Sequence, residues 1–532
     1  MDEEKQRRSA SLQHLLRPPS NPAEHEGLQI SDDMFGGSAS SDDANSSSEL
    51  SLSDDMLVVT GLEEEDSEEM GDEDEDRGES ADDGGWAANI AHFDPPCFSD
   101  GEKVGPVRDI SPNTQPIDFF HMLVPESLLS AIVQQTNRYA HKYQLKNGRD
   151  EEWRNVDLAE LKAFMAIFMY TSIVHGIFSE DITTVWEDNS ITYNPVIASI
   201  MTQRRFQHIM QYFHVVSSSA QQQSDSLRKI RPFLEAVQNS FRNEFKTAQT
   251  HVVHEPPLEE EPSVWSPRLE RKRRKKKRFN LFVRQCTATG FISQIYIHVK
   301  DKNDNQTLHE KGYSIARALC SDLINSGRNH IIFCEPLHTS LRLFRELESR
   351  NIYGCGVITD AKHSDCDGLP ASVLAKPPAS MRKYNSIVRT KGRYSSMVWN
   401  SPRIPFRLLT NAFSPAAQGK LVVKKNRRPD EELPCPEAVQ AYQNHIKYID
   451  KYNEKFSWYI ISYKPNKTWQ QLFWTVLSLA MNNSYIMYKM SPAYAHSQLS
   501  RNNFGADLLR AMAGPYYQEV PAWGEDISDP ED

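Results

Sequence analysis

The order of the secondary-structure elements predicted between residues 249 and 368 restricts the fold of this 532-residue chain more than any other feature. Hydrophobic periodicity changes there from helical spacing to short apolar or alternating runs, which are typical of strands. The runs FNLFVRQC and FISQIYIHV are separated by a turn at residues 287–290 and predict a hairpin. The predicted elements are a strand at Thr250 to His254, the hairpin at 279–299, a helix at about Ser314 to Ile324, a strand at 330–335, a helix at about Thr339 to Arg350 and a strand at 352–358. Together they predict an α/β domain.

Strand, hairpin, helix, strand, helix and strand is the order typical of an RNase H-like α/β domain, whose first part we assign to residues 249–368. Residues 369–434 interrupt this order with Pro, Lys and short β pieces such as SSMVWNS, so we expect a β-rich insertion there. Helical periodicity resumes in residues 435–490, which we expect to complete the RNase H-like core. Residues 491–532 are expected to form a C-terminal tail.

Two segments of different character precede this domain. Residues 106–248 show apolar residues at helical spacing and predict an all-helical domain, whose Met and Phe stripes we interpret as core packing. Asp157 and Glu160 resemble a capping box at the start of one of its helices. Residues 1–105 contain runs such as SASSDDANSSS and EEEDSEEMGDEDED, which offer little apolar surface to bury. They predict a disordered acidic N-terminal arm.

Charge is distributed unevenly between the arm and the rest of the chain. Residues 1–105 hold 29 Asp and Glu against 6 Lys and Arg, a net charge of −23, so the remainder carries +11 of the total of −12. A basic body is expected of a polyanion binder, because Lys and Arg near phosphates release condensed counterions. An ordinary solvated surface is the alternative. The arm is either a solubilising tail or a segment that screens the basic body until it is displaced.

Cysteine spacing and apolar runs indicate the compartment. None of the seven cysteines shows CxxC spacing and the last is Cys435, so we expect reduced thiols and no zinc module. The first residues, MDEEKQRRSASL, lack the apolar core of a secretory signal. The most apolar stretch, Leu161 to Gly176, is too short to cross a bilayer. We therefore expect a soluble intracellular protein without a membrane partner.

A dense basic cluster, RLERKRRKKKR at residues 268–278, is the strongest local motif. Such clusters are typical of nuclear-import signals and of surfaces that contact phosphates. We predict nuclear localisation, the nuclear import machinery as a partner, and DNA contact by the same side chains. A solvated loop between strands is the alternative, which the one-sided charge disfavours. The candidate residues are Lys272, Arg273, Arg274, Lys275, Lys276, Lys277 and Arg278.

Two longer segments resemble the piggyBac transposases. YNPVIASIMTQRRFQHIMQYFHV (193–215) is similar to the helical region of that family and ends in its RF…I…FH pattern. KPNKTWQQLFWTVLSLAMNNSYIMYK (464–489) resembles its C-terminal catalytic-domain helix. The similarity extends over about residues 116 to 490. It implies the ancestry of a nuclear cut-and-paste transposase that acts on double-stranded DNA, a DNA-binding or dimerisation role for residues 106–248, and, by analogy, a homodimer.

The resemblance also implies three Asp side chains that hold two Mg²⁺ ions for phosphodiester transfer. Carried over by motif, the first Asp falls on His254 in VVHEP, the second on Glu335 in FCEPLHTS, and the third on Asp450, eight residues after Tyr442. A further family Asp corresponds to Asn453. Imidazole is a poor ligand for Mg²⁺, and Glu displaces its carboxylate by one methylene relative to Asp. The acidic triad is therefore eroded, with Glu335 and Asp450 as the remaining candidate metal ligands.

Three functional hypotheses remain open. The first is a transposase-derived nuclear DNA-binding protein that is weakly catalytic or non-catalytic. The second is an active recombinase that uses Mg²⁺ or Mn²⁺ and the non-standard acids Glu255, Glu335 and Asp450. The third is a nuclear protein-interaction scaffold. Further acids that could replace a lost ligand, or that form an exposed acidic loop instead, are Glu259, Glu260, Glu261, Asp360 and Asp365.

Overall fold

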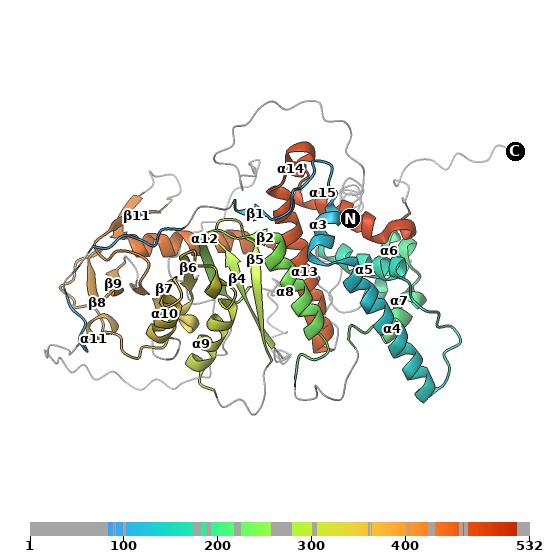
Figure 1. Cartoon of the computed structure of the whole chain (residues 1–532), viewed down its shortest axis with the longest axis horizontal. Coiled ribbons are helices and arrows are strands. Elements are labelled where there is room, and N and C mark those ends of the chain that lie inside the picture. The colour runs from blue at the N-terminus through green and yellow to red at the C-terminus, as the bar shows by residue number, and fades with distance from the viewer. Residues whose placement is uncertain are drawn as a thin grey trace, which may run out of the picture. The chain divides into compact units, whose positions relative to one another are not determined.

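The computed structural model contains one eight-stranded mixed β-sheet, with helices before, between and after its strands (Figure 1). The described residues are 83–88, 90, 92–98, 103–173, 182–187, 193–216, 225–256, 279–299, 306–359, 362, 364–401, 404–423, 431–456, 461 and 467–518. No single helix in these ranges is long and apolar enough to cross a membrane. The pair α3 (Pro116–Leu123) and α4 (Glu126–Asn147) reaches that length only across a 68° bend.

The central sheet has the strand order β5-β4-β3-β6-β7-β10-β9-β8. Strands β3, β6 and β7 are parallel to one another, and every other neighbouring pair is antiparallel. The first five strands of this sheet in sequence order, β3 to β7, lie where the sequence pattern predicts the initial strand, the hairpin and two buried strands. The strands are β3 (Thr250–His254), β4 (Phe279–Cys286), β5 (Ile292–Val299), β6 (His330–Cys334), β7 (Ile352–Ile358), β8 (Ser386–Lys391), β9 (Tyr394–Asn400) and β10 (Pro405–Thr410).

Helices cover both faces of the three parallel strands, as the continuous apolar sequences of these strands require. Helices α9 (Leu308–Leu319) and α10 (Leu341–Glu348) pack on one face. Helix α12 (Glu437–Phe456) packs on the other face, where the rings of His445 and Phe333 stack with centroids 4.3 Å apart. The core of the domain therefore lies on both sides of β3, β6 and β7.

Helix α9 begins earlier than the sequence pattern predicts, at Leu308 instead of Ser314. The Thr307 hydroxyl accepts a hydrogen bond from the Glu310 backbone N–H at 3.2 Å, and a Glu310 carboxylate oxygen accepts one from the Thr307 N–H at 2.9 Å. This capping box satisfies N–H groups that a helix start leaves without partners. The cap, and not the onset of clear apolar spacing, decides where this helix starts.

The β-rich segment predicted at residues 369–434 contains strands as expected, but three of them continue the central sheet. β10 pairs antiparallel with β7, and β9 and β8 follow it outward. Helix α11 (Ala371–Leu374) precedes them, and β11 (Gln418–Val423) pairs with β12 (Glu431–Pro436) in a two-stranded sheet. The insertion is therefore an extension of the sheet along its edge.

The helices from the two ends of the chain share one aromatic core. Phe168 stacks on Trp474 with ring centroids 3.9 Å apart, and Phe164 and Phe213 also lie against Trp474. The expected tail after residue 490 is wrong in its first part, because α15 packs against α3 and α5 and buries Phe504 completely. The helices are α3 (Pro116–Leu123), α4 (Glu126–Asn147), α5 (Leu158–Ile173), α6 (Pro195–Ile200), α7 (Gln203–Tyr212), α8 (Arg231–Glu244), α13 (Thr468–Lys489), α14 (Pro492–Ser497) and α15 (Arg501–Ala513).

Side chains of two helices occupy the free edge of β5. The Asn483 amide accepts a hydrogen bond from the Ile292 N–H at 3.0 Å and donates one to the Ile292 carbonyl at 2.8 Å. The Gln238 carbonyl oxygen accepts from the Ile295 N–H at 3.0 Å. An edge strand with unpaired backbone groups promotes intermolecular pairing, so these contacts both attach α8 and α13 to the sheet and block its edge.

The last part of the predicted disordered arm is docked on the sheet. We name residues 83–98 the strap. Ala87 forms an antiparallel bridge with Thr390 of β8, and Trp86 is 6% exposed within the core cluster. The Gln249 side chain donates to the Pro96 carbonyl at 2.8 Å, just before β3 begins. The boundary predicted at residue 105 is therefore too late, because Trp86 supplies the apolar surface that the Ser-rich and acidic runs lack. In Figure 1 the strap is the blue trace beside β8 that continues to β1 (Gly105–Pro106).

Candidate functional site

The ends of β3 and β6 bring together two of the three positions carried over from the family motifs. Parallel pairing aligns Val253 with Cys334, so the next residues, His254 and Glu335, are neighbours where these strands end. Adjacent strands lie about 4.8 Å apart, a distance that two side chains can bridge. Glu255 directly follows His254. We name this place the β3–β6 edge.

His254 is enclosed by protein at this edge. The residue is only 3% exposed, and its Nε2 atom lies 2.9 Å from the Gln285 amide oxygen. Because the Gln285 amide nitrogen donates to the Gly290 carbonyl at 2.8 Å, its oxygen is the acceptor and His254 Nε2 carries the proton. Burial lowers the pKa of His254 to about 4, and the nearby His338 acts in the same direction. The imidazole is therefore neutral at physiological pH, with one nitrogen committed to Gln285.

Glu335 stands at the start of a tightly held turn. The 3-10 helix η4 (Pro336–His338) follows it, and the Thr339 hydroxyl donates to the Glu335 carbonyl at 3.0 Å. His338 Nδ1 donates to the Gly312 carbonyl at 3.0 Å. A Cβ atom at Gly312 would lie 1.9 Å from a carbonyl oxygen of η4, so only glycine permits this approach of α9. The backbone of Glu335 is therefore fixed by contacts with α9 and by its own turn.

The remaining described acids near the strand ends have local partners. Glu255 is half-buried and accepts a hydrogen bond from the Asn280 amide at 3.3 Å. Asp365 is half-buried in the segment after β7 and accepts from the Asp367 N–H at 3.2 Å. The candidates Glu259, Glu260, Glu261 and Asp360 lie outside the described residues.

Asp450 lies in helix α12, as does Asn453, and their side chains are outside the described part of the structure. Among the described side chains of α12, His445 is the one closest to Asp450 in the sequence for which a hydrogen bond is seen. Its Nδ1 is 2.7 Å from the Thr287 hydroxyl. Thr287 is bonded to the backbone of Thr250, at the start of β3, whereas His254 is at its end. The convergence of Asp450 with His254 and Glu335 stays a prediction.

The described residues of the β3–β6 edge do not fit a magnesium site. Mg²⁺ needs hard oxygen ligands in a near-octahedral arrangement, and His254 offers a buried neutral imidazole at the first ligand position. Within the described ranges, no group of three or more His, Cys, Asp and Glu side chains is arranged to hold a metal ion. Glu335 remains in place as a carboxylate next to His254.

The basic cluster lies outside the described residues, yet both of its attachment points are described. It belongs to the connection between His254, the last residue of β3, and Phe279, the first residue of β4. Antiparallel pairing aligns His254 with Val283, so β4 begins beyond the end of β3. The connection that contains the cluster in its sequence therefore starts and ends on the same side of the sheet as the β3–β6 edge.

Two residues of this edge were not identified from the sequence. Gln285 holds His254, and His338 holds the turn after Glu335. The only sequence signal for Gln285 is a polar residue inside the apolar strand FNLFVRQC. His338 carries no such signal, because its partner is a backbone carbonyl of α9.

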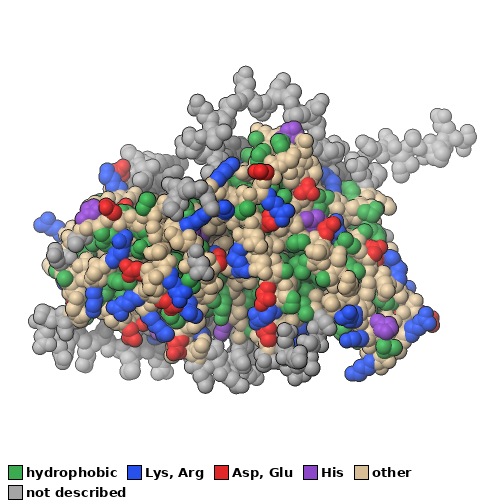
Figure 2. Space-filling model, viewed as in Figure 1, with side chains coloured by type: hydrophobic (Ala, Val, Ile, Leu, Met, Phe, Trp, Pro, Cys, Tyr) green, Lys and Arg blue, Asp and Glu red, His purple; other side chains and the backbone are tan. Residues whose placement is uncertain are grey.

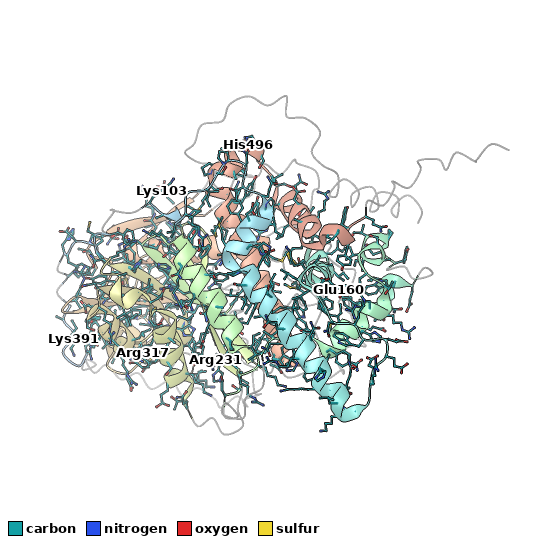
Figure 3. The ribbon with its side chains drawn as sticks, turned by 45° about the vertical axis from the view of Figure 1, so that its right-hand side comes forward. Lys103, Glu160, Arg231, Arg317, Lys391 and His496 are labelled. Atoms are coloured by element: carbon teal, nitrogen blue, oxygen red, sulfur yellow. The ribbon has the colours of Figure 1, made fainter. Side chains whose placement is uncertain are left out.

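The RF…I…FH motif that suggested the family has a structural explanation. Glu160 is 1% exposed among the helices (Figure 3), and Arg205 donates to it through Nε at 2.7 Å and Nη2 at 2.6 Å. Arg154 donates to the same carboxylate at 2.6 Å. The predicted capping box is thus half present, because the Glu160 N–H does bond to Asp157 at 2.7 Å but its side chain binds the arginines instead. The motif residues Phe206, Ile209 and Phe213 are all buried.

Comparisons with known proteins agree with this architecture. A family model described as transposase IS4 matches residues 115–485. The human piggyBac transposable element-derived protein 5 is 42% identical over 442 residues, 81% of each chain. The human piggyBac transposable element-derived protein 2 is 20% identical, over 76% of this chain and 65% of its own length. A cryo-EM structure of a piggyBac transposase synaptic complex with hairpin DNA has a similar fold, with a TM-score of 0.62 and 17% identity over 78% of this chain and 83% of that one. The chain belongs to the piggyBac transposase family, as a domesticated, transposase-derived member.

Proposed function

We propose that this chain is a nuclear protein that binds double-stranded DNA and that its β3–β6 edge does not support efficient metal-dependent strand transfer. The observation that carries the proposal is the buried neutral histidine at the end of β3, where the resemblance implies a metal-ligating acid. The connection from β3 to β4, whose sequence contains the basic cluster, starts at this histidine. Lys and Arg in such a segment bind phosphates by releasing counterions. The fold supports the proposal, since a structure with this fold is of a piggyBac transposase in a complex with hairpin DNA.

We also propose that the sheet and its helices form an RNase H-like domain. The central order β5-β4-β3-β6-β7, with β3 parallel to β6 and β7, is the arrangement expected of that domain. In this arrangement the ends of the first and fourth strands are adjacent, which is where a strand-transferring enzyme places two of its acids. The proposal therefore assigns His254 and Glu335 to the remains of a catalytic centre.

The described surface alone does not distinguish a DNA-binding protein. On the face in Figure 2, Lys and Arg side chains are interspersed with Asp and Glu. The test must therefore address the basic cluster directly. DNA affinity is measured by fluorescence anisotropy over a series of salt concentrations, with Lys275, Lys276 and Lys277 replaced by Gln together. A matched control replaces Arg317, Arg342 and Arg345, three exposed residues of α9 and α10, by Gln.

We expect the cluster variant to lose about 2.7 units of the slope of log affinity against log salt, about 0.9 for each phosphate contact. The control changes the net charge equally and should retain most of the slope. Equal effects of the two variants would assign the binding to general charge and refute the role of the cluster. A green fluorescent fusion of the full chain tests localisation, because the cluster variant should leave the nucleus.

The second candidate function is strand transfer through Glu255, Glu335 and Asp450 with Mg²⁺ or Mn²⁺. The observation that favours it is the fixed backbone of Glu335 beside the first ligand position. Titration calorimetry of the wild type and of Asp450→Asn with each metal tests it. Divalent binding that disappears in Asp450→Asn would support this function, and equal heats for both proteins would remove it.

A further inference from the structure

The strap binds a set of basic side chains that is separate from the basic cluster. Residues 368–429 contain 13 Lys and Arg and no Asp or Glu. Three of these basic residues, Arg389, Lys391 and Arg393, alternate along the hairpin between β8 and β9, which we name the basic hairpin. Lys391 lies at the outer end of the sheet in Figure 3. A sequence this one-sided in charge needs anionic or carbonyl partners from elsewhere in the chain or from a ligand.

The strap supplies a partner to each residue of the basic hairpin. Arg389 Nε donates to the Asp83 carboxylate at 2.6 Å, and Lys391 Nζ donates to the Gly84 carbonyl at 3.0 Å. Arg393 Nη2 donates to the Asp94 carbonyl at 2.9 Å, and its guanidinium lies 4.5 Å from the centroid of the Phe93 ring. In this set only Asp83 provides a full negative charge, and it also accepts hydrogen bonds from the Ser372 N–H at 2.8 Å and hydroxyl at 2.7 Å.

Two properties allow the strap groups that bind Arg389 and Lys391 to be replaced by another anionic partner. Arg389 and Asp83 retain 25% and 13% side-chain exposure, so water competes with their ion pair. Asp83 and Gly84 precede the anchor residue Trp86, whose indole N–H donates to the Gly368 carbonyl at 2.9 Å. Release of Asp83 and Gly84 therefore need not remove Trp86 from the core. The acidic run EEEDSEEMGDEDED ends at Asp76, a few residues before Asp83 in the sequence.

We propose that the strap competes in cis with DNA for the basic hairpin. In this proposal, which rests on the DNA-binding function above, backbone phosphates take the places of Asp83 and the Gly84 carbonyl on Arg389 and Lys391. The acidic arm then sets the DNA affinity of the chain by occupying a second phosphate-binding surface. A phosphate is a suitable replacement, because Arg binds phosphate and carboxylate oxygens through the same paired N–H geometry.

The test uses the full chain and the substitution Asp83→Asn, which keeps the shape of the side chain and removes its charge. Asp94→Asn is the matched control, because Asp94 is exposed in the same strap and contacts Arg393 through its backbone carbonyl. DNA affinity is measured by anisotropy from about 50 to about 200 mM salt, the range over which phosphate contacts are resolved. Thermal unfolding confirms that both variants fold. A double variant, Asp83→Asn with Arg389→Gln, removes the side chain that is expected to gain a phosphate.

Freeing Arg389 and Lys391 adds one or two phosphate contacts, so the affinity of Asp83→Asn should fall about 3- to 12-fold more over this salt range than that of Asp94→Asn. The double variant should lose this gain. Hydrogen exchange at the Ser372 N–H, which is bonded to the Asp83 carboxylate in the free protein, should become faster when DNA binds. If wild-type protein binds DNA and the two single variants bind it equally, the strap proposal is wrong and DNA binding stands. If no protein of the set binds DNA, both proposals fail.

Discussion

Restoring the family's first Asp by His254→Asp should destabilise the protein instead of rebuilding a metal site. His254 is 3% exposed and donates to Gln285, so Asp would place a carboxylate against an amide oxygen and beside Glu335. Loss of the hydrogen bond costs about 1 kcal/mol, and an uncompensated buried charge costs about 3–5 kcal/mol. The control His254→Asn has the same shape as Asp and no charge, so it should lose only about 1–2 kcal/mol.

The assay is thermal unfolding of the wild type and both variants, with and without Mg²⁺, at several pH values. A change of 1 kcal/mol corresponds to about 2 °C for a domain of a few hundred residues, so the charge cost of about 3–5 kcal/mol should make the Asp variant melt about 6–10 °C below the Asn variant at neutral pH. The difference should narrow as pH falls, since a protonated Asp is neutral. Equal melting temperatures for the Asp and Asn variants without metal would refute the conclusion that residue 254 is buried and that a charge there is not compensated. Selective stabilisation of the Asp variant by Mg²⁺ would refute it too.

Three further predictions concern the scaffold and its pH dependence. Glu160→Gln should lower the free energy of unfolding by about 3 kcal/mol in urea denaturation, because it leaves Arg205 buried without its charge partner, and an effect below about 1 kcal/mol would contradict this. Asn483→Leu should cost about 2–3 kcal/mol and promote aggregation, seen by light scattering, since both backbone groups of Ile292 lose their partner. The pKa of His254 is about 4 in the folded protein and about 6.5 in the unfolded chain, so the unfolded chain takes up the proton first as pH falls. The contribution of His254 to the free energy of unfolding is therefore complete above pH 6.5, and about 3 kcal/mol of that free energy is lost as pH falls to 4. His254→Asn should flatten that part of the pH–stability curve, and an unchanged slope would contradict the assignment.

Much of the fold could be predicted because local patterns determine it. The hairpin FNLFVRQC and FISQIYIHV and the buried strand HIIFC depend on apolar alternation and on apolar runs, which short segments of sequence record. The docked strap and the C-terminal α15 were missed for the opposite reason. Trp86 is a single large apolar residue in a polar segment, and Phe504 belongs to a short apolar run near the end of the chain. Each is buried by elements that lie hundreds of residues away in the sequence.

The sequence nominated candidate residues but did not describe the state of their side chains. Motif spacing selected His254, Glu335 and Asp450, and parallel pairing makes the first two neighbours, while their role as a site stays a prediction. Nothing in VVHEP shows that the imidazole is buried, neutral and bonded to Gln285, because that partner lies on the adjacent antiparallel strand and is fixed by register. Side-chain ionisation depends on such three-dimensional neighbours, so the sequence could nominate the site without describing its chemistry.

Family membership and chemistry are recorded in different residues of this chain. The motif that identifies the family consists of core residues and of the Arg205–Glu160 ion pair, whose removal would disturb the packing of the helices. The metal chemistry that the family resemblance implies would need carboxylates at three positions, and one of these positions holds the imidazole of His254, which is buried and bonded to Gln285. None of the core residues of the family motif is part of that contact, so we propose that the metal site and the scaffold can change independently. Metal binding at Asp450 and Glu335 is therefore the measurement that separates the two candidate functions, because both share the family and the fold.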